Sequence, residues 1–310
     1  MSFKILFMGT PNFAVPILNS LFETKHKILE VYTQPPSKKY RGLKTINSPV
    51  HEFSKKNNIP VRCPISLESE NELNHIKKLK PDVVIVVAYG KILPSSFLNL
   101  DKTIFVNLHA SLLPKWRGAA PIQRSILNMD KETGVSIMKI VPKLDAGPIL
   151  IQSKIKIFKK TTYEELSRKM INEGTRLIIK SLELIQNNKA NFIHQNESQA
   201  TYAKKIQKFE SKIDWNESAD KIIAKINAFN PNPGCWFDFF GARIKIIKAK
   251  EVPNAGHKPG TILNNNLTIA CSENAIQILE LKKESKKKML VEEFLRGNKI
   301  NIGENLIVHD

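Results

Sequence analysis

The longest apolar run in the chain lies in the segment Asp82-Val83-Val84-Ile85-Val86-Val87-Ala88-Tyr89. A strand without polar interruptions is typical of a parallel sheet that is covered on both faces. Shorter apolar strands are predicted at Lys4–Met8, Ile28–Thr33 and Thr103–Leu108, and the stretch Phe13–Phe22 has helical apolar spacing. Because strands and helices alternate along this part of the chain, we expect an α/β fold with a Rossmann-like, doubly wound, mostly parallel sheet.

The pattern of predicted elements changes near residue 209. Residues 1–188 alternate strands and helices, whereas residues 189–208 show little periodicity and are predicted to be a linker. Residues 209–310 contain one helix, Ser218–Phe229, followed by short alternating strands between polar turns, which favour a small, OB-like β-barrel. A chain of 310 residues is long enough for two domains. We therefore expect an α/β domain, a linker and a smaller β-barrel domain.

The composition is that of a globular protein, with 42% hydrophobic and 25% charged residues. The apolar runs are too short to cross a bilayer, and the N-terminal run ends in the turn Gly9–Asn12 rather than in a cleavage site. The three cysteines are far apart and form no CxxC pair, which argues against a disulfide framework and against a structural zinc site. These features predict a soluble protein of the reducing cytoplasm.

The chain is strongly basic, with 48 lysines and arginines against 29 acidic residues and a formal net charge of +19. Such a charge attracts polyanions, so a nucleic-acid partner is one interpretation. The other is a genomic bias toward A/T-rich codons, because most of the basic residues are lysine and because Asn and Ile are abundant. Charge alone leaves both interpretations open.

The first predicted turn, Gly9-Thr10-Pro11-Asn12, lacks the GxGxxG pattern of dinucleotide-binding sheets. That pattern needs glycines so that the backbone can approach a pyrophosphate, whereas Pro11 and Phe13 crowd this turn. We therefore do not expect NAD binding, despite the Rossmann-like beginning of the chain.

Asn107 and His109 stand at the carboxyl end of the predicted strand Thr103–Leu108. A spacing of two puts both side chains on one face of the strand, at the edge where open α/β sheets bind their ligands. The Asn107 amide can donate a hydrogen bond to a developing oxyanion, and His109 can transfer a proton near neutral pH. The alternative is structural: Asn107 caps the junction between strand and loop, and His109 is a buried histidine with satisfied hydrogen bonds.

Asp145 lies in the loop Lys143-Leu144-Asp145-Ala146-Gly147-Pro148, between the predicted strands Gly134–Ile140 and Ile149–Ile157. From this loop its carboxylate can face the same crevice, where an acid would orient the histidine and stabilise its charged form. Asp is also common at the start of a turn such as the one before Gly147-Pro148. The sequence of the loop leaves these two interpretations open.

Several motifs in both halves of the chain carry a specific resemblance. They are Met8-Gly9-Thr10-Pro11-Asn12-Phe13-Ala14, Val86–Pro94, Asn107-Leu108-His109-Ala110-Ser111-Leu112-Leu113-Pro114 with Lys115–Gln123 after it, Leu144-Asp145-Ala146-Gly147, Asp214-Trp215, Ala228-Phe229-Asn230-Pro231 and Phe294-Leu295-Arg296-Gly297. Together they resemble the methionyl-tRNA formyltransferase family over nearly the whole chain. The Asn/His/Asp triple alone resembles only the wider superfamily of 10-formyltetrahydrofolate-dependent formyltransferases.

The resemblance implies an enzyme that transfers a formyl group from 10-formyltetrahydrofolate to the α-amine of methionyl initiator tRNA, for translation initiation. It implies that Asn107, His109 and Asp145 are the catalytic residues and that no metal takes part. The residues that it implies for the folate site are Val86, Val87, Ala88, Tyr89, Gly90, Ser111, Leu112, Leu113, Pro114, Val141 and Leu144.

The resemblance also implies that tRNA binds to the predicted loop Gln34–Val50 and to the β-barrel domain, and we expect the protein to be a monomer. The residues implied at the acceptor end of the tRNA are Lys38, Lys39, Arg41, Gly42 and Lys44. The loop departs from the family pattern, because Ser37-Lys38-Lys39-Tyr40 replaces a Pro-Ala-Gly stretch and a single lysine follows Leu43. Without the resemblance, we would expect a solvated surface loop.

In the mechanism that the resemblance implies, the α-amine attacks the formyl carbon and negative charge develops on the formyl oxygen. Asn107 and protonated His109 would stabilise that oxygen, and one such donor is typically worth about 3 kcal/mol. Asp145 would orient His109 and relay the amine proton to N10 of the departing folate. The α-amine is already partly neutral near pH 7, so no stronger nucleophile is required.

Three other functions stay open on the sequence. A formyltransferase acting on an amino sugar would use the same N-terminal site, and a hydrolase of 10-formyltetrahydrofolate would use water in place of the amine. A non-catalytic RNA-binding protein would use only the basic loop and the β-barrel. The basic loop and the second domain favour the tRNA enzyme, because both suit a large polyanion.

Overall fold

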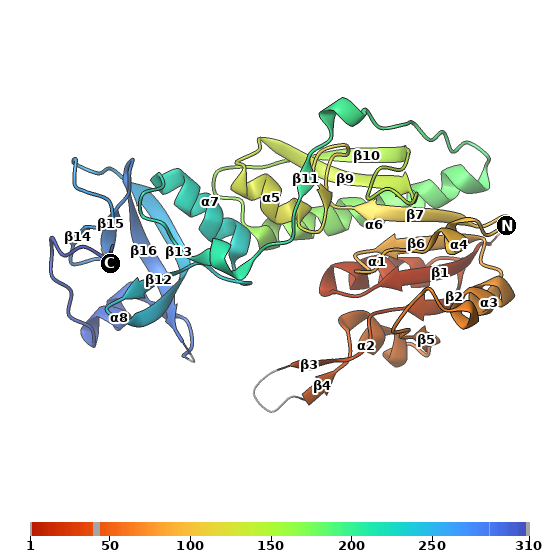
Figure 1. Ribbon diagram of the computed structural model, residues 1–310, viewed down its shortest axis with the longest axis horizontal. Coiled ribbons are helices and arrows are strands. Elements are labelled where there is room, and N and C mark those ends of the chain that lie inside the picture. Colours follow the sequence, from red (N-terminus) through yellow and green to blue (C-terminus); the bar gives the residue numbers. More distant parts are fainter. Residues whose placement is uncertain (1, 40–43, 285, 308–310) are drawn as a thin grey trace. The chain divides into compact units, whose positions relative to one another are not determined.

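The computed structural model describes residues 2–39, 44–284 and 286–307. The chain divides into two compact units (Figure 1). The first unit comprises Met1–Gly118, Thr133–Ile155 and Ser167–Ala203, and the second comprises Ala119–Glu132, Lys156–Leu166 and Lys204–Asp310. Each unit contains its own sheet and its own buried apolar side chains.

The sheet of the first unit has seven strands in the order β10-β9-β7-β6-β1-β2-β5 (Figure 1). Their bounds are β1 Lys4–Gly9, β2 Lys27–Tyr32, β5 Val61–Arg62, β6 Val83–Val87, β7 Ile104–His109, β9 Glu132–Lys139 and β10 Ile149–Lys156. The strands from β7 to β5 are parallel, and β9 runs antiparallel to β7. This order confirms the predicted Rossmann-like, mostly parallel α/β fold.

Helices cover both faces of this sheet. They are α1 Val15–Phe22, α2 Pro49–Lys56, α3 Glu70–Leu79, α4 Ser95–Leu98 and α6 Tyr163–Gln186. On one face, Val84 of β6 shares a core with Ile76 of α3 and Phe97 of α4. On the other face, α6 comes so close to β7 that a Cβ at Gly174 would lie 2.7 Å from the side chain of Leu108. Cover on both faces is what the unbroken apolar run of β6 requires.

The expectation of a loop over Gln34–Val50 is wrong in part. β3 (Ser37–Lys39) pairs with β4 (Lys44–Ile46) in an antiparallel ladder, and α2 begins at Pro49. The start of α2 does carry a sequence signal, because Ser48 Oγ accepts the His51 N–H at 3.0 Å and a proline occupies the first turn. The ladder carries no apolar alternation that would have marked it as a hairpin.

The sheet of the second unit is antiparallel, in the order β12-β13-β16-β15-β14, with β17 paired to β16. Its strands are β12 Trp236–Phe239, β13 Ala242–Val252, β14 Ile262–Asn264, β15 Thr268–Ala270, β16 Ala275–Lys283 and β17 Met289–Leu290. Register shifts between Ile246 and Ala249 bend β13, as bulges do. The sheet curls into a half-barrel, which confirms the predicted smaller β-barrel domain.

Alternating apolar side chains build the core of this second unit. Ile244 and Ile246 of β13 are fully buried, as are Ile276, Ile278 and Leu281 of β16. The ring of Phe294, in α8 (Val291–Arg296), packs against Phe239 with 5.3 Å between the ring centroids. Two further helices of the unit, α5 (Pro121–Leu127) and α7 (Ala219–Phe229), pack against each other.

The predicted linker 189–208 contains ordered structure. β11 (Tyr202–Ala203) pairs in parallel with β8 (Arg117–Gly118), and Thr201 Oγ1 accepts the Trp116 N–H at 2.9 Å. The last of the boundaries between the two units falls between Ala203 and Lys204, inside the predicted linker. The domain boundaries at residues 188 and 209 stay predictions.

The close approach of β9 to its neighbours leaves no room for a side chain at Gly134. A methyl group there would overlap the carbonyl oxygen of Ser153, and only a backbone shift could relieve that contact. We expect Gly134→Ala to lower the free energy of unfolding by about 1–3 kcal/mol, the usual cost of overpacking. Urea unfolding followed by circular dichroism measures this change, and a variant as stable as the parent chain would contradict it.

Candidate active site

Asn107 and His109 lie at the carboxyl end of β7, near the middle of the sheet of the first unit. Val86 of β6 pairs with Asn107, and Ser136 of β9 pairs with His109. The two residues therefore share one face of β7 at the edge where the parallel strands end. This is the placement that their spacing of two predicts.

His109 is held from both sides of its ring. Only 5% of the residue is exposed, and its Nε2 lies 2.8 Å from the carbonyl oxygen of Trp116. Because a carbonyl oxygen only accepts hydrogen bonds, Nε2 carries the proton in this contact. The other ring nitrogen, Nδ1, lies 3.6 Å from Oδ2 of Asp145.

Asp145 reaches His109 from the loop between β9 and β10. Its backbone φ of 45° lies in the left-handed region, which Asp tolerates better than most residues. The same Oδ2 that faces His109 accepts the backbone N–H of Gly118 at 2.8 Å. The structure thus brings Asp145 to His109, as expected for an acid that orients a histidine, while the catalytic roles of both residues stay predictions.

The side-chain amide of Asn107 is half-buried and makes no hydrogen bond to any residue in the described ranges. The structural alternative, a cap at the junction of strand and loop, would have required such a bond. An amide in this position can therefore take an atom of a substrate as its partner.

The segment Ser111–Pro114 is shaped by two polar side chains that the sequence did not point to. Ser136 Oγ donates to the carbonyl of Ser111 at 2.6 Å and accepts the Leu113 N–H at 3.1 Å. Gln152 donates to the Leu113 carbonyl at 2.9 Å. The Ser111 hydroxyl is itself buried and donates to the carbonyl of Lys115. Its contribution is to the shape of the loop, and a folate contact by Ser111–Pro114 stays a prediction.

The segment after β6 exposes backbone at the same edge of the sheet. Ala88 has a φ of 48° and Gly90 a φ of 84°, and both residues are exposed. In contrast, Val86, Val87 and Tyr89 are buried, and burial raises the pKa of the Tyr89 hydroxyl, which keeps it neutral. A ligand at this segment would therefore contact its backbone and Ala88, and not the side chains of Val87 and Tyr89.

Two further residues implied for the folate site lie in the loop that carries Asp145. Val141 is half-buried, and Leu144 is 54% exposed. An exposed leucine next to Asp145 is a suitable contact for the face of a flat heteroaromatic ring such as a pterin. These side chains and the exposed backbone at Ala88 fit a folate, and the folate contacts themselves stay predictions.

Three of the residues implied for tRNA binding fall on the paired strands β3 and β4. Lys38 and Lys39 belong to β3 and Lys44 to β4, with Lys39 paired to Lys44. Arg41 and Gly42 lie outside the described residues. The ladder thus brings three lysines onto one hairpin, and their contact with tRNA stays a prediction.

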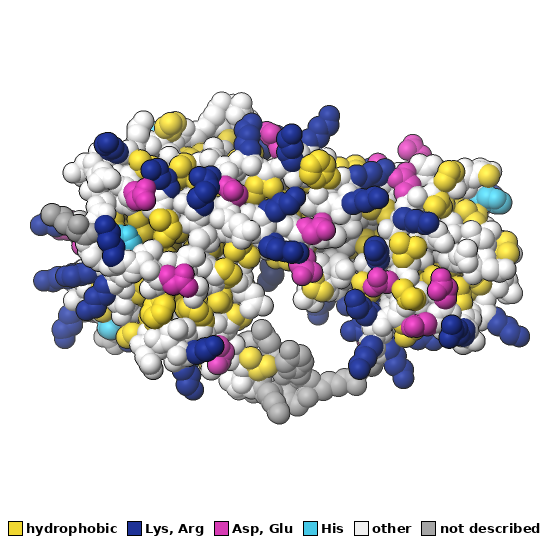
Figure 2. Space-filling model, turned by 180° about the vertical axis from the view of Figure 1, so that it is seen from behind, with side chains coloured by type: hydrophobic (Ala, Val, Ile, Leu, Met, Phe, Trp, Pro, Cys, Tyr) yellow, Lys and Arg dark blue, Asp and Glu magenta, His cyan; other side chains and the backbone are white. Residues whose placement is uncertain are grey.

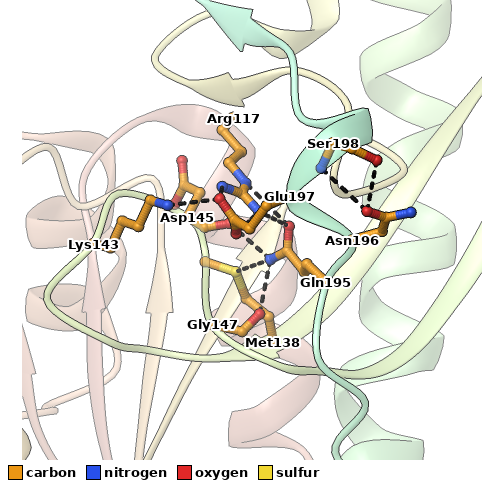
Figure 3. A network of polar contacts seen from close by, with 9 residues as sticks. All are labelled: Arg117, Met138, Lys143, Asp145, Gly147, Gln195, Asn196, Glu197 and Ser198. Carbon is orange, nitrogen blue, oxygen red and sulfur yellow. Dashed lines mark hydrogen bonds and ion pairs between the residues drawn. The ribbon is translucent and has the colours of Figure 1, made fainter.

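A buried arginine next to the site was not among the predicted residues. Arg117 is fully buried, and it donates to Gln195 Oε1 at 3.1 and 2.8 Å and to Glu197 at 3.2 and 2.8 Å (Figure 3). Glu197 also accepts from Lys143 Nζ at 2.6 Å. The hydrogen bonds that the Glu197 carboxylate accepts from Arg117 raise the pKa of Arg117. A buried arginine does require an acceptor, but the sequence does not say that this acceptor comes from residues 195–197.

Comparison with known proteins assigns the chain to a family. The family model described as formyl transferase matches residues 3–182, and the model described as formyl transferase, C-terminal domain, matches residues 205–299. The chain belongs to the formyl transferase family. Curated relatives include the methionyl-tRNA formyltransferase of Pelagibacter ubique (strain HTCC1062), 47% identical over 308 residues and 99% of each chain. That of Rickettsia prowazekii (strain Madrid E) is 42% identical over 299 residues, 96% of this chain and 97% of the relative.

Two solved structures are similar to this formyl transferase in fold. An N-formyltransferase from Helicobacter canadensis, in complex with folinic acid and dTDP-3-aminofucose, has a TM-score of 0.68 at 24% identity and covers 89% of this chain and 99% of that one. HypX from Aquifex aeolicus, in complex with tetrahydrofolic acid, has a TM-score of 0.68 at 16% identity and covers 98% of this chain and 51% of that one. At these identities the likeness shows the formyl transferase fold and does not decide the acceptor.

Removing the charge of Glu197 tests the ion-pair network through its dependence on pH. The Arg117 guanidinium and the Lys143 ammonium lower the pKa of Glu197 from 4.5 to about 2. An acid with a lowered folded-state pKa stabilises the fold above its ordinary pKa, and this contribution is lost as the pH falls through the folded-state value. We therefore expect the parent chain to lose more free energy of unfolding than Glu197→Gln as the pH falls from 4.5 toward about 2.

Denaturant titrations of both proteins at a series of pH values measure this difference. The ion pairs of Glu197 also predict that the free energies of unfolding of the parent chain and of Glu197→Gln become similar at the lowest pH values. Equal losses in the two proteins would contradict the pairing of Glu197 with Arg117 and Lys143.

Proposed function

We propose that this chain transfers the formyl group of 10-formyltetrahydrofolate to the α-amine of methionyl initiator tRNA. The observation that carries the proposal is the end-to-end similarity to curated methionyl-tRNA formyltransferases. The site supports it chemically, because an amide with no partner among the described residues, a buried imidazole and a carboxylate lie at one edge of the sheet. The folate cosubstrate supplies the formyl group when it is bound.

Asn107 is proposed to donate its amide N–H to the formyl oxygen as negative charge develops there. The amide has no competing hydrogen bond within the described residues, so it is free to make this one. His109 is proposed to assist through the positive charge of its protonated ring, because both ring nitrogens already face a partner. Hydrogen-bond donors fixed by the fold stabilise such charge without reorganising, which is the usual source of their large effect on rate.

Asp145 is proposed to hold His109 in orientation and to pass the proton of the attacking amine toward N10 of the leaving folate. Its carboxylate lies 3.6 Å from His109 Nδ1 and accepts the Gly118 N–H. One oxygen can thus be fixed by the Gly118 N–H while the second is available to the reacting groups. The amine loses a proton and N10 gains one, so the transfer balances without an external base.

We further propose that the chain acts as a cytoplasmic monomer and binds the tRNA acceptor end through Lys38, Lys39, Arg41, Gly42 and Lys44, with the half-barrel domain binding tRNA as well. Lysine and arginine side chains are spread over the face seen in Figure 2, as expected for a protein that attracts a polyanion. Within the described ranges, no helix is long and apolar enough to cross a membrane. All three cysteines are free thiols, which suits a reducing compartment.

A formyl-transfer assay with three acceptors tests the function. The acceptors are charged initiator tRNA, a nucleotide-linked amino sugar and water alone, with 10-formyltetrahydrofolate as the donor in each case. We expect N-formylmethionyl-tRNA as the product. Formylation of the sugar, or release of formate without an acceptor, would replace the proposal with one of the two rival enzymes.

Truncating Asn107 tests the proposed donor. Because the amide acts on charge that appears only during the reaction, we expect Asn107→Ala to lower kcat about a hundredfold. The KM for each substrate should change little. Asn71→Ala is a matched control, because Asn71 is an exposed asparagine in α3. An unchanged kcat in Asn107→Ala, measured in the same assay, would refute this role.

Neutralising the hairpin tests the contact with tRNA. We expect Lys38→Ala with Lys39→Ala to weaken tRNA binding and to reduce the slope of log Kd against log salt by up to about two, because each phosphate contact releases close to one counterion. Lys77→Ala with Lys78→Ala, two exposed lysines in α3, removes the same charge elsewhere. Identical salt slopes for both double variants would mean that the hairpin makes no specific contact with phosphates.

A further inference from the structure

The side-chain amide of Gln195 has an orientation that its partners determine. Its Nε2 donates to the carbonyl oxygens of Asp145 at 2.8 Å and of Gly147 at 2.7 Å (Figure 3). Its Oε1 accepts two hydrogen bonds from Arg117. If the amide were flipped, Oε1 would face the two carbonyl oxygens and Nε2 would face the Arg117 guanidinium, and neither contact could form a hydrogen bond. Only the observed orientation therefore satisfies all four hydrogen bonds.

The loop that receives these bonds is conformationally demanding. Asp145 has a φ of 45°, and at Gly147 even a Cβ would overlap the carbonyl oxygen of Lys139. A backbone in this state is kept only where the surroundings hold it. Gln195 donates hydrogen bonds to two carbonyl groups of this loop, and Glu197 accepts one from Lys143, which belongs to the same loop.

Arg117 connects Gln195 and Glu197 to the segment that contacts Asp145 and His109. Its neighbour Gly118 donates the N–H that fixes the Asp145 carboxylate, and its neighbour Trp116 provides the carbonyl that fixes His109 Nε2. Arg117 itself holds Gln195 and Glu197 through its guanidinium. Residues 116–118 therefore hold the histidine and the acid directly, and Arg117 also supports the loop of the acid through Gln195 and Glu197.

We propose that Arg117 and Gln195 are positioning residues, which set the distance between the Asp145 carboxylate and His109. This inference rests on the proposed function, because it assigns to Asp145 and His109 the roles given above. Gln195 acts through the Asp145 backbone and Arg117 acts through Gln195, so neither needs to touch a substrate. Without the hydrogen bonds of Gln195 and Arg117, the substrates still bind, but the Asp145 carboxylate is misplaced relative to His109.

A purely structural role would make Gln195 important only as a partner for the buried Arg117. Gln195→Glu separates the two roles, because a carboxylate still pairs with Arg117 but offers acceptors to the carbonyls of Asp145 and Gly147. Gln195→Met removes both sets of hydrogen bonds at a similar volume. Asn196→Ala is the matched control from the same segment, because within the described residues the Asn196 side chain bonds only Ser198.

The experiment measures kcat and KM for both substrates in the full chain, together with thermal unfolding. We expect Gln195→Glu and Gln195→Met to lower kcat about 10- to 100-fold, as misplacement by a fraction of an ångström to one ångström does, with KM changed less than about threefold. Asn196→Ala should keep the parent kcat. Gln195→Glu should fold and melt close to the parent chain, since Arg117 keeps an acceptor.

A second readout does not depend on activity. In ¹⁵N NMR spectra of the histidine side chains, assigned with a His109→Gln variant, the His109 ring resonances should move in Gln195→Glu and stay in place in Asn196→Ala. A Gln195→Glu protein with the parent kcat and unmoved His109 resonances would overturn the proposal. If the parent chain formylates no methionyl-tRNA, the proposed function fails, while the NMR comparison still decides whether Gln195 positions Asp145 against His109.

Discussion

The site depends on the pairing of one buried positive charge. Arg117 is completely withdrawn from water, and an unpaired guanidinium in that position would destabilise the fold strongly. Its acceptors, Gln195 and Glu197, lie 78 and 80 positions further along the chain. Satisfying this charge brings the segment after α6 back over the loop of Asp145. The same contact that stabilises the fold therefore also sets the geometry in which the acid meets His109.

The parallel sheet provides the other half of the site. β6 and β7 end at the same edge, so the parallel pairing alone puts the turn at Ala88–Gly90 at the edge where Asn107 and His109 lie. The amide of Asn107 is left without a partner among the described residues, whereas both nitrogens of His109 have neighbours. This contrast suits a donor that meets the substrate and a ring that is held in place for it.

Much of this arrangement could be predicted from local patterns. The apolar run of β6 and the spacing of Asn107 and His109 depend on strand geometry alone, and the structure has both as expected. For Asp145 the sequence allowed a turn or an acid facing the histidine, and the resemblance to formyltransferases favoured the second. The hairpin of β3 and β4 and the role of Gln195 could not be predicted, because backbone pairing without apolar alternation and contacts between distant segments leave no local signal.

The central claim is that an amide, an imidazole and a carboxylate act on one formyl group at this edge of the sheet. A crystal structure of the chain with a stable folate that carries its formyl group on N10 tests it most directly. The account predicts that the formyl oxygen lies within about 3.2 Å of Asn107 Nδ2, with Asp145 still facing His109. A folate bound with its formyl group turned away from Asn107 and His109, or bound elsewhere on the chain, would contradict it.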